Sequence, residues 1–274
     1  MSSLPAESLT AVGFCGADDS VTPEQLVAIA RAHPKVEFGV LLRPDLEGTP
    51  RYASPTWLTD LRRLVVIGDG KAPMLRFAAH LCGSRVNEVL RGDTVYFETH
   101  VLPCFTRVQI NATAVNGVDT SRLEEGVPHL WNLIRKFPQT EFILQWNDET
   151  TKLCRGIEQL LVEHDSSAQK DQAIDNVSIL VDESKGTGKL SSQWSSPSCS
   201  MYNVGFAGGI GPDNIIPVLE DITAYVKANI ELTGRSTFWV DMESSLRSIQ
   251  NGRDVFDLAK CSSVIEQLGR IGMM

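Results

Sequence analysis

The sequence predicts an α/β fold, a single (β/α)8 barrel of the TIM type, and three observations support this prediction. Short runs rich in Val, Ile and Phe alternate with amphipathic stretches along the whole chain, which is the pattern of parallel βα units. Eight such runs can be counted, and eight parallel strands close a barrel of this kind. The length of 274 residues is close to the ~250 residues that one such barrel takes.

The eight expected strands are short and rich in β-branched and aromatic residues, as buried parallel strands are. They are residues 12–15, 36–42, 75–81, 107–112, 141–146, 178–182, 202–207 and 237–241. The helices are expected to begin near Pro23, Pro55, Arg85, Arg122, Thr150, Trp194, Asp213 and Asp254. Thr22 before Pro23, and Ser54 before Pro55, place a hydroxyl cap ahead of a proline at the first helical position. The helix near Trp194 is expected to be the least regular, because residues 191–200 are rich in serine.

The alternation also fits an open, doubly wound sheet, which is the alternative architecture. No G-x-G-x-x-G follows the first expected strand, so the main sequence argument for a dinucleotide-binding sheet is missing. Two long segments, near 93–106 and 165–176, are expected to be surface insertions because a strand resumes the alternation after each of them. Residues 1–274 are therefore expected to form one domain.

Charge and composition restrict the possible partners. The net charge of −9 argues against a nucleic-acid or acidic-membrane surface, and any phosphate pocket must be built locally. No apolar run approaches the ~20 residues of a membrane span, and the first ten residues lack the layout of a signal peptide. The six cysteines show no close-paired metal spacing. We therefore expect a cytoplasmic protein with reduced thiols, no metal site and no cofactor.

Two strand ends offer groups for acid–base chemistry, because catalytic residues of such barrels lie at the carboxyl ends of the strands. Cys15 ends the first strand and is followed by Gly16; the alternative is a buried structural cysteine. Asp182 ends the sixth strand and is a candidate general acid, although it could also cap backbone amides of its loop. His80, at the end of the third strand, is either an additional acid or base or a packing residue.

The loops after the last two strands suit a phosphate group. Gly208 and Gly209 precede Pro212 and a helix start, so they expose consecutive backbone N–H groups. Ser244 and Ser245 bring hydroxyls and amides to the neighbouring position after the eighth strand. Many barrels bind phosphate between these two loops, although each loop taken alone is also compatible with a tight turn.

Several segments, in chain order, carry a resemblance to a known family. They are Cys15-Gly16, Thr49-Pro50-Arg51-Tyr52-Ala53-Ser54-Pro55, Val108-Gln109-Ile110-Asn111-Ala112, Asp182 with Gly186-Thr187-Gly188-Lys189 and Trp194, Ala207-Gly208-Gly209 with Pro212 and Asn214, Val240-Asp241 with Ser244, and Gly252-Arg253-Asp254 at the start of the final helix. With these segments the chain resembles phosphoribosylanthranilate isomerase over nearly its full length. That family consists of barrels of the ribulose-phosphate-binding type, and its members open an aminoribose phosphate by an Amadori rearrangement in tryptophan biosynthesis.

The resemblance implies an isomerase, an intramolecular oxidoreductase, that acts on a small phosphorylated substrate without a cofactor. It makes Cys15 the general base and Asp182 the general acid. The substrate-binding and phosphate-binding positions that it implies are Arg51, Gly186 and Gly188, and then Gly208, Gly209, Ser244 and Ser245. Arg51 would bind the carboxylate of the substrate ring, a contact that suits the planar guanidinium.

The chain also departs from the family pattern in loops that would face the substrate. Gly13 stands where the family has a lysine, Asn116 where it has a histidine, and Glu243 where it has a serine. Glu243 would set a carboxylate beside the expected phosphate. These departures keep two alternatives open: a non-catalytic phosphosugar- or phosphate-binding barrel descended from the family, and a different phosphosugar isomerase or epimerase. A barrel with a purely structural role is a third reading.

Overall fold

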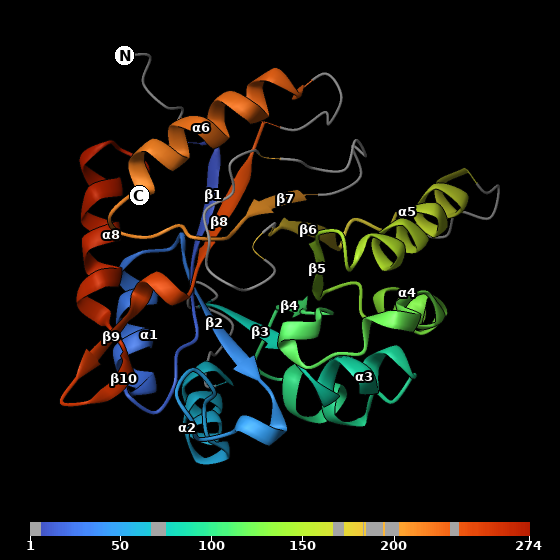
Figure 1. Cartoon of the computed structure of the whole chain (residues 1–274), viewed down its shortest axis with the longest axis horizontal. Helices are drawn as coiled ribbons and strands as arrows, with labels where there is room; N and C mark the ends of the chain where they lie inside the picture. Colours follow the sequence, from blue (N-terminus) through green and yellow to red (C-terminus); the bar gives the residue numbers. More distant parts are fainter. Residues whose placement is uncertain are drawn as a thin grey trace.

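The computed structural model of the chain describes residues 7–66, 75–166, 173–182, 184, 194, 203–230 and 236–274. Eight parallel strands pair in sequence order and close into a barrel, which confirms the predicted (β/α)8 architecture (Figure 1). The strands are β1 Leu9–Cys15, β2 Val36–Leu42, β3 Arg76–Leu81, β4 Arg107–Ile110, β5 Glu141–Trp146, β6 Val177–Val181, β7 Asn203–Phe206 and β8 Phe238–Met242. β1 pairs with β8, with Gly13 opposite Asp241, so the sheet is closed and the open alternative is wrong.

The helices surround the strands on the outside of the barrel (Figure 1). They are α1 Pro23–Ala32, α2 Pro55–Val66, α3 Ser84–Leu90, α4 Val127–Lys136, α5 Thr151–Ser166, α6 Ile215–Ala228 and α8 Leu258–Arg270. Shorter helices are η1 Pro44–Leu46, η2 Phe97–Val101, η3 Ala114–Asn116, η4 Thr120–Gly126 and η5 Ser244–Leu246. No α-helix in the described part of the chain has the length and apolar composition of a membrane span.

The start of α1 follows from its sequence. Thr22 accepts a hydrogen bond from the amide of Gln25, and the Gln25 side chain accepts one from the amide of Thr22, so the two form a capping box ahead of Pro23. The helix expected near Trp194 falls outside the described residues except for Trp194 itself. Its ring packs against Phe206, with 5.3 Å between ring centroids.

Two expected helix starts are displaced. The fourth helix begins at Val127 rather than near Arg122, because Arg122 has non-helical backbone angles within η4. The last helix begins at Leu258, after an antiparallel hairpin of β9 Arg247–Gln250 and β10 Arg253–Phe256 (Figure 1). Asn251 and Gly252 form its turn with φ values of 51° and 74°, and Asn-Gly favours such a two-residue turn. The expected helix start at Asp254 is therefore wrong.

The segment near 93–106 is partly a core element. It contains η2, whose Phe97 and Val101 are buried, and the Phe97 ring stacks on Phe142 of β5 with 5.8 Å between centroids. Only Val95 in this stretch is a large apolar residue that is strongly exposed. Of the second expected insertion, residues 167–172 lie outside the described residues.

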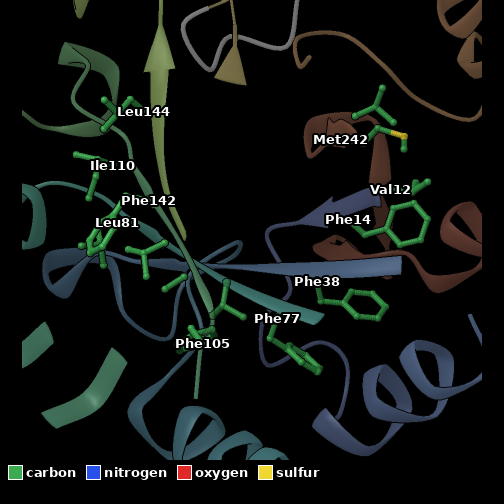
Figure 2. Close-up of a cluster of buried hydrophobic side chains, with 14 of the residues drawn as sticks. Val12, Phe14, Phe38, Phe77, Leu81, Phe105, Ile110, Phe142, Leu144 and Met242 are labelled. Carbon is green, nitrogen blue, oxygen red and sulfur yellow. The ribbon is translucent and has the colours of Figure 1, made fainter. Parts of the chain in front are cut away.

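Strand side chains alternate between the helix layer and the barrel interior, because successive residues of a strand point to opposite faces. Phe14, Phe38 and Phe77 of the neighbouring strands β1, β2 and β3 all lie on the helix side (Figure 2). Their ring centroids are 5.9 Å apart in each neighbouring pair. All three rings are buried, and burying each one contributes about 1.5–3 kcal/mol. Their strand neighbours therefore face the interior.

A cluster of buried charged side chains fills the barrel interior near the amino ends of the strands, which we call its lower part. Arg107 of β4 bonds to Glu37 of β2, and its Nε lies 2.9 Å from Glu141 Oε2 of β5. Glu141 also accepts a hydrogen bond from Ser178 of β6, and the Arg107 guanidinium lies over the Trp239 ring of β8. The cluster links five of the eight strands across the interior.

Replacing Arg107 by an uncharged residue should lower the free energy of unfolding by more than the loss of side-chain packing alone would. Arg107→Met leaves Glu37 buried without its cation, and such a change typically costs about 3–5 kcal/mol of unfolding free energy. The measurement is urea unfolding at pH 7, with Arg63→Met on the exposed face of α2 as control. Adding Glu37→Gln to Arg107→Met should recover part of the loss, and a double variant less stable than Arg107→Met would contradict this account.

Candidate active site

A cavity of about 220 Å³ opens at the carboxyl ends of the strands. It brings together seven of the residues that the sequence singled out: Cys15, Arg51, Asp182, Gly208, Gly209, Ser244 and Ser245. Gly186 and Gly188, the other two predicted substrate contacts, lie outside the described residues. The cavity also takes in His80, for which the sequence left an acid–base role and a packing role open. Polar side chains without a predicted role line it as well: Tyr52, Gln109, Asn111, Gln145 and Asp241.

Cys15 meets His80 inside the cavity. Its Sγ lies 3.9 Å from His80 Nε2, although β2 runs between the strands that carry the two residues. Gly39 of β2 makes this approach possible, because a Cβ there would lie 2.8 Å from both atoms. Burial, together with the nearby carboxylates of Asp241 and Glu243, raises the pKa of the Cys15 thiol well above its usual value. Burial lowers the pKa of His80 to about 3, so its imidazole is neutral.

Asp182 lies just after β6 and is buried. One of its oxygens accepts a hydrogen bond from Gln145 Nε2 at 2.8 Å. The other accepts from the amide of Ser184 at 3.1 Å and from the Ser184 hydroxyl, so Asp182 does cap its own loop. Its role as general acid stays a prediction, and its position on the cavity wall is compatible with that role.

Arg51 does not stand free in the cavity. Its Nη1 lies 2.8 Å from Glu243 Oε1 and donates to Ser244 Oγ at 3.1 Å. Glu243, which departs from the family pattern, is therefore the counter-ion of the arginine expected to bind a substrate carboxylate. Burial raises the pKa of Glu243, and Arg51 opposes that rise.

Asp18 fixes the backbone of Arg51. The φ of Arg51 is 79°, in the left-handed region that non-glycine residues rarely adopt. Its amide donates to Asp18 Oδ2 at 2.6 Å, and Arg247 Nη2 lies 2.8 Å from the same carboxylate. Burial alone would raise the pKa of Asp18, but hydrogen bonds from Ser20, Arg51 and Arg247 hold it below its usual value.

The two loops predicted to bind phosphate lie against each other. Ser245 Oγ donates to the carbonyl of Ile210, and Asn214 Nδ2 donates to the carbonyl of Gly209 at 2.8 Å. Gly208 and Gly209 have φ values of 99° and 67°, so glycine is required at both positions. Within the described part of the chain, the amides of Gly208, Gly209, Ser244 and Ser245 donate no hydrogen bond. These four amides are compatible with the predicted anion site, which stays a prediction.

Asp241 is the main feature that the sequence analysis left without a role. It lies on β8, two residues after the interior Trp239, and is 6% exposed. A Cβ on Gly13 would lie 1.7 Å from Asp241 Oδ1, so this carboxylate occupies the space above Gly13, where the family carries a lysine. Burial, with Glu37 adding to it, raises the pKa of Asp241 to about 7. The two-residue period of β8 places Asp241 on the same interior face as Trp239, but its contact with Gly13 follows only from the pairing of β8 with β1.

Alternating polar residues in β4 and just after it were also overlooked. Gln109 Nε2 donates to Asn111 Oδ1, and Asn111 Nδ2 lies 3.4 Å from Cys82 Sγ. Asn116, which replaces the family's histidine, donates to Thr113 Oγ1 at 2.7 Å and lines the cavity mouth.

Comparison with known proteins adds no relative. No protein-family model matches the chain, and no curated protein sequence matches it either.

Asp18→Asn should lower the unfolding free energy at pH 7 by about 1–3 kcal/mol, the value of charge-assisted hydrogen bonds. The native pKa is below the ~3.9 of an unfolded aspartate, so the stabilisation is present above that pH and is lost as the pH falls through the native pKa. The difference in unfolding free energy between wild type and Asp18→Asn should therefore become smaller as the pH falls. Thermal unfolding from pH 7 to pH ~3 measures this, with the exposed Asp221→Asn as control; a constant difference would rule out the carboxylate as its cause.

Glu243→Gln should strengthen the binding of inorganic phosphate by about fivefold to tenfold. The change removes a negative charge beside the amide loops and releases Arg51 from its ion pair. Isothermal titration of phosphate into wild type and variant provides the measurement, and Glu220→Gln on the exposed face of α6 is the control. Unchanged or weaker binding in Glu243→Gln would place the phosphate elsewhere.

Proposed function

We propose that the chain is an isomerase that rearranges an aminoribose phosphate by general acid–base catalysis, as phosphoribosylanthranilate isomerase does. One observation carries the proposal. Cys15 at the end of β1 and Asp182 after β6 line the same cavity as the amide-rich loops Gly208–Gly209 and Ser244–Ser245. A phosphate at these loops would leave the rest of the substrate between the two candidate proton-transfer groups.

The proposed reaction needs two proton transfers. Asp182 protonates the ring oxygen as the ring opens to an iminium ion. Cys15 then removes the proton from the adjacent carbon, which gives an enamine that becomes the keto product. Because the resting Cys15 is a thiol, its own proton has to leave to solvent before this step, since burial lowers the pKa of the neighbouring His80 to about 3 and makes it a weak base. Positioned proton transfer of this kind typically contributes about 10²–10⁴ in rate.

The Arg51–Glu243 ion pair bears on which substrate fits. A substrate carboxylate would have to replace Glu243 on the guanidinium, and it would meet the repulsion of that displaced side chain. This pair favours a second candidate within the same reaction class: an isomerase or epimerase whose phosphosugar carries no carboxylate next to Arg51. In that case Arg51 and Glu243 would bind sugar hydroxyls together.

The test is turnover of phosphoribosylanthranilate by the purified chain, followed by single variants. Cys15→Ser and Asp182→Asn should each lower kcat by about 10²–10⁴, because each removes a group that acts only in the transition state. Arg51→Ala should act mainly on KM, since a charge contact with the bound substrate persists through the reaction. Cys261→Ser, a buried thiol on α8 outside the cavity, should leave both constants unchanged.

Two results would contradict the proposal. Wild-type protein that binds a substrate analogue without turnover above the spontaneous rate would support the non-catalytic binding barrel. Turnover of a phosphosugar without a carboxylate, and none of phosphoribosylanthranilate, would support the second candidate.

A further inference from the structure

Three side chains that can bind a metal ion converge in the cavity. Cys15 of β1, His80 of β3 and Asp241 of β8 each direct one ligand atom to a common point, and these atoms lie within 4.8 Å of one another. All three residues are buried, and all three line the cavity. We propose that they form the binding site of a divalent metal ion of the zinc class. The proposal goes beyond the isomerase function and does not depend on it.

Two glycines clear the space in which the three atoms meet. A Cβ on Gly39 would lie 2.8 Å from Cys15 Sγ and from His80 Nε2, and a Cβ on Gly13 would lie 1.7 Å from Asp241 Oδ1. Both glycines lie inside strands, and neither has a positive φ. The backbone conformation therefore does not require glycine at either position. The missing side chains instead leave the space in which the three ligand atoms approach each other.

Asp241 points to a ligand independently of the other two residues. Its Oδ1 is fully buried and has no hydrogen-bond partner among the described residues. A buried carboxylate oxygen without a partner is unfavourable, and such atoms in native proteins are usually satisfied by a partner, a water or an ion. A metal ion at the common point would satisfy this oxygen directly.

The charges of the cavity wall favour a cation. Among the described lining residues the only lysine or arginine is Arg51, and it is already paired with Glu243. Asp182 and Asp241 then leave the cavity with an excess of carboxyl groups. A divalent cation would balance them.

The donor set selects the metal. Magnesium and calcium prefer oxygen ligands, whereas a thiolate with an imidazole favours zinc or a similar transition metal. With Zn–S near ~2.3 Å and Zn–N near ~2.0–2.1 Å, a tetrahedral ion holds sulfur and nitrogen roughly 3.6 Å apart. Cys15 Sγ and His80 Nε2 are 3.9 Å apart, so a small side-chain shift brings this pair to that distance, and the Asp241 oxygen, within 4.8 Å of both, has to move in with them. Three protein ligands leave a fourth position toward the cavity for water or a substrate oxygen.

Metal binding changes the state of Cys15. The thiol proton leaves to solvent as the sulfur–metal bond forms, and the sulfur is then a ligand that cannot remove a proton from a substrate carbon. Bound zinc is therefore expected to inhibit the proposed isomerisation. No cysteine spacing indicates such a site, because Cys15 and His80 are 65 residues apart and come together only through the barrel.

The test uses the full chain, freed of metal by a chelator and titrated with Zn²⁺ alone and with Co²⁺ alone. Wild type should bind one ion per chain, and the Co²⁺ form should show thiolate-to-cobalt charge-transfer absorption. Cys15→Ser should abolish that absorption, and Cys15→Ser, His80→Ala and Asp241→Asn should each weaken Zn²⁺ binding at least ~100-fold. Cys261→Ala, which removes a buried thiol outside the cavity, should bind both ions as wild type does.

The variant Gly39→Ala tests the space between the three ligand atoms without removing any of the ligands. It keeps all three side chains but fills the space between them, so it should also weaken Zn²⁺ binding, and circular dichroism with thermal unfolding checks that each variant is folded. Absence of stoichiometric binding by wild type would overturn the proposal, and so would a charge-transfer absorption that survives Cys15→Ser. Turnover by the metal-free chain is measured separately, so failure of the metal site leaves the proposed isomerase to be judged on its own.

Discussion

The closure of the barrel imposes the constraint on which the rest of the molecule depends. Once eight strands close into a ring, every second side chain of each strand must enter an interior of fixed width. Phe14 and Phe38 then face the helices (Figure 2). Their neighbours Cys15 and Gly39 face inward, where Cys15 Sγ meets His80 across Gly39. The interior is divided along its axis. Its lower part holds Arg107 with two glutamates, and its upper part holds the groups of the candidate site.

In such a narrow interior, the smallest residues shape the candidate site as much as the reactive ones do. His80 on β3 reaches Cys15 on β1 only because Gly39 on the strand between them has no side chain. Asp241 turns toward β1 for the same reason, since Gly13 leaves room for its carboxylate. Gly13 and Asp241 therefore depend on each other, because the carboxylate fills the space that a side chain at position 13 would need.

Local signals predicted the strands within a few residues, because each strand is a short apolar run bounded by turn residues. The positions of the two amide loops were predicted as well. The paired glycines indicate exposed backbone N–H groups, and the paired serines after the eighth strand bring hydroxyls and amides beside them. The hairpin before the last helix was missed although Asn251-Gly252 signals a turn, because the alternation of strand and helix suggested a helix start there. The contact of Asp241 with Gly13 had no local signal, since it depends on register across the closing pair β1 and β8. The Arg51–Glu243 pair joins residues 192 positions apart, and no spacing rule connects them.

The chemistry of the site depends on what balances a negative charge on Cys15. Reactive thiolates normally have a cation or a helix N-terminus beside them. Here burial and three carboxylates, those of Asp241, Glu243 and Glu37, oppose ionisation. The arginine that favours it, Arg107, is already bound to Glu37 and Glu141. A thiolate at this position therefore needs a positive partner from outside the present set of contacts. His80 is too weak a base to become that partner, because burial lowers its pKa to about 3, whereas the proposed metal ion between the two residues would supply the positive charge. Such an ion requires the short distance between Cys15 and His80, which exists because Gly39 has no side chain.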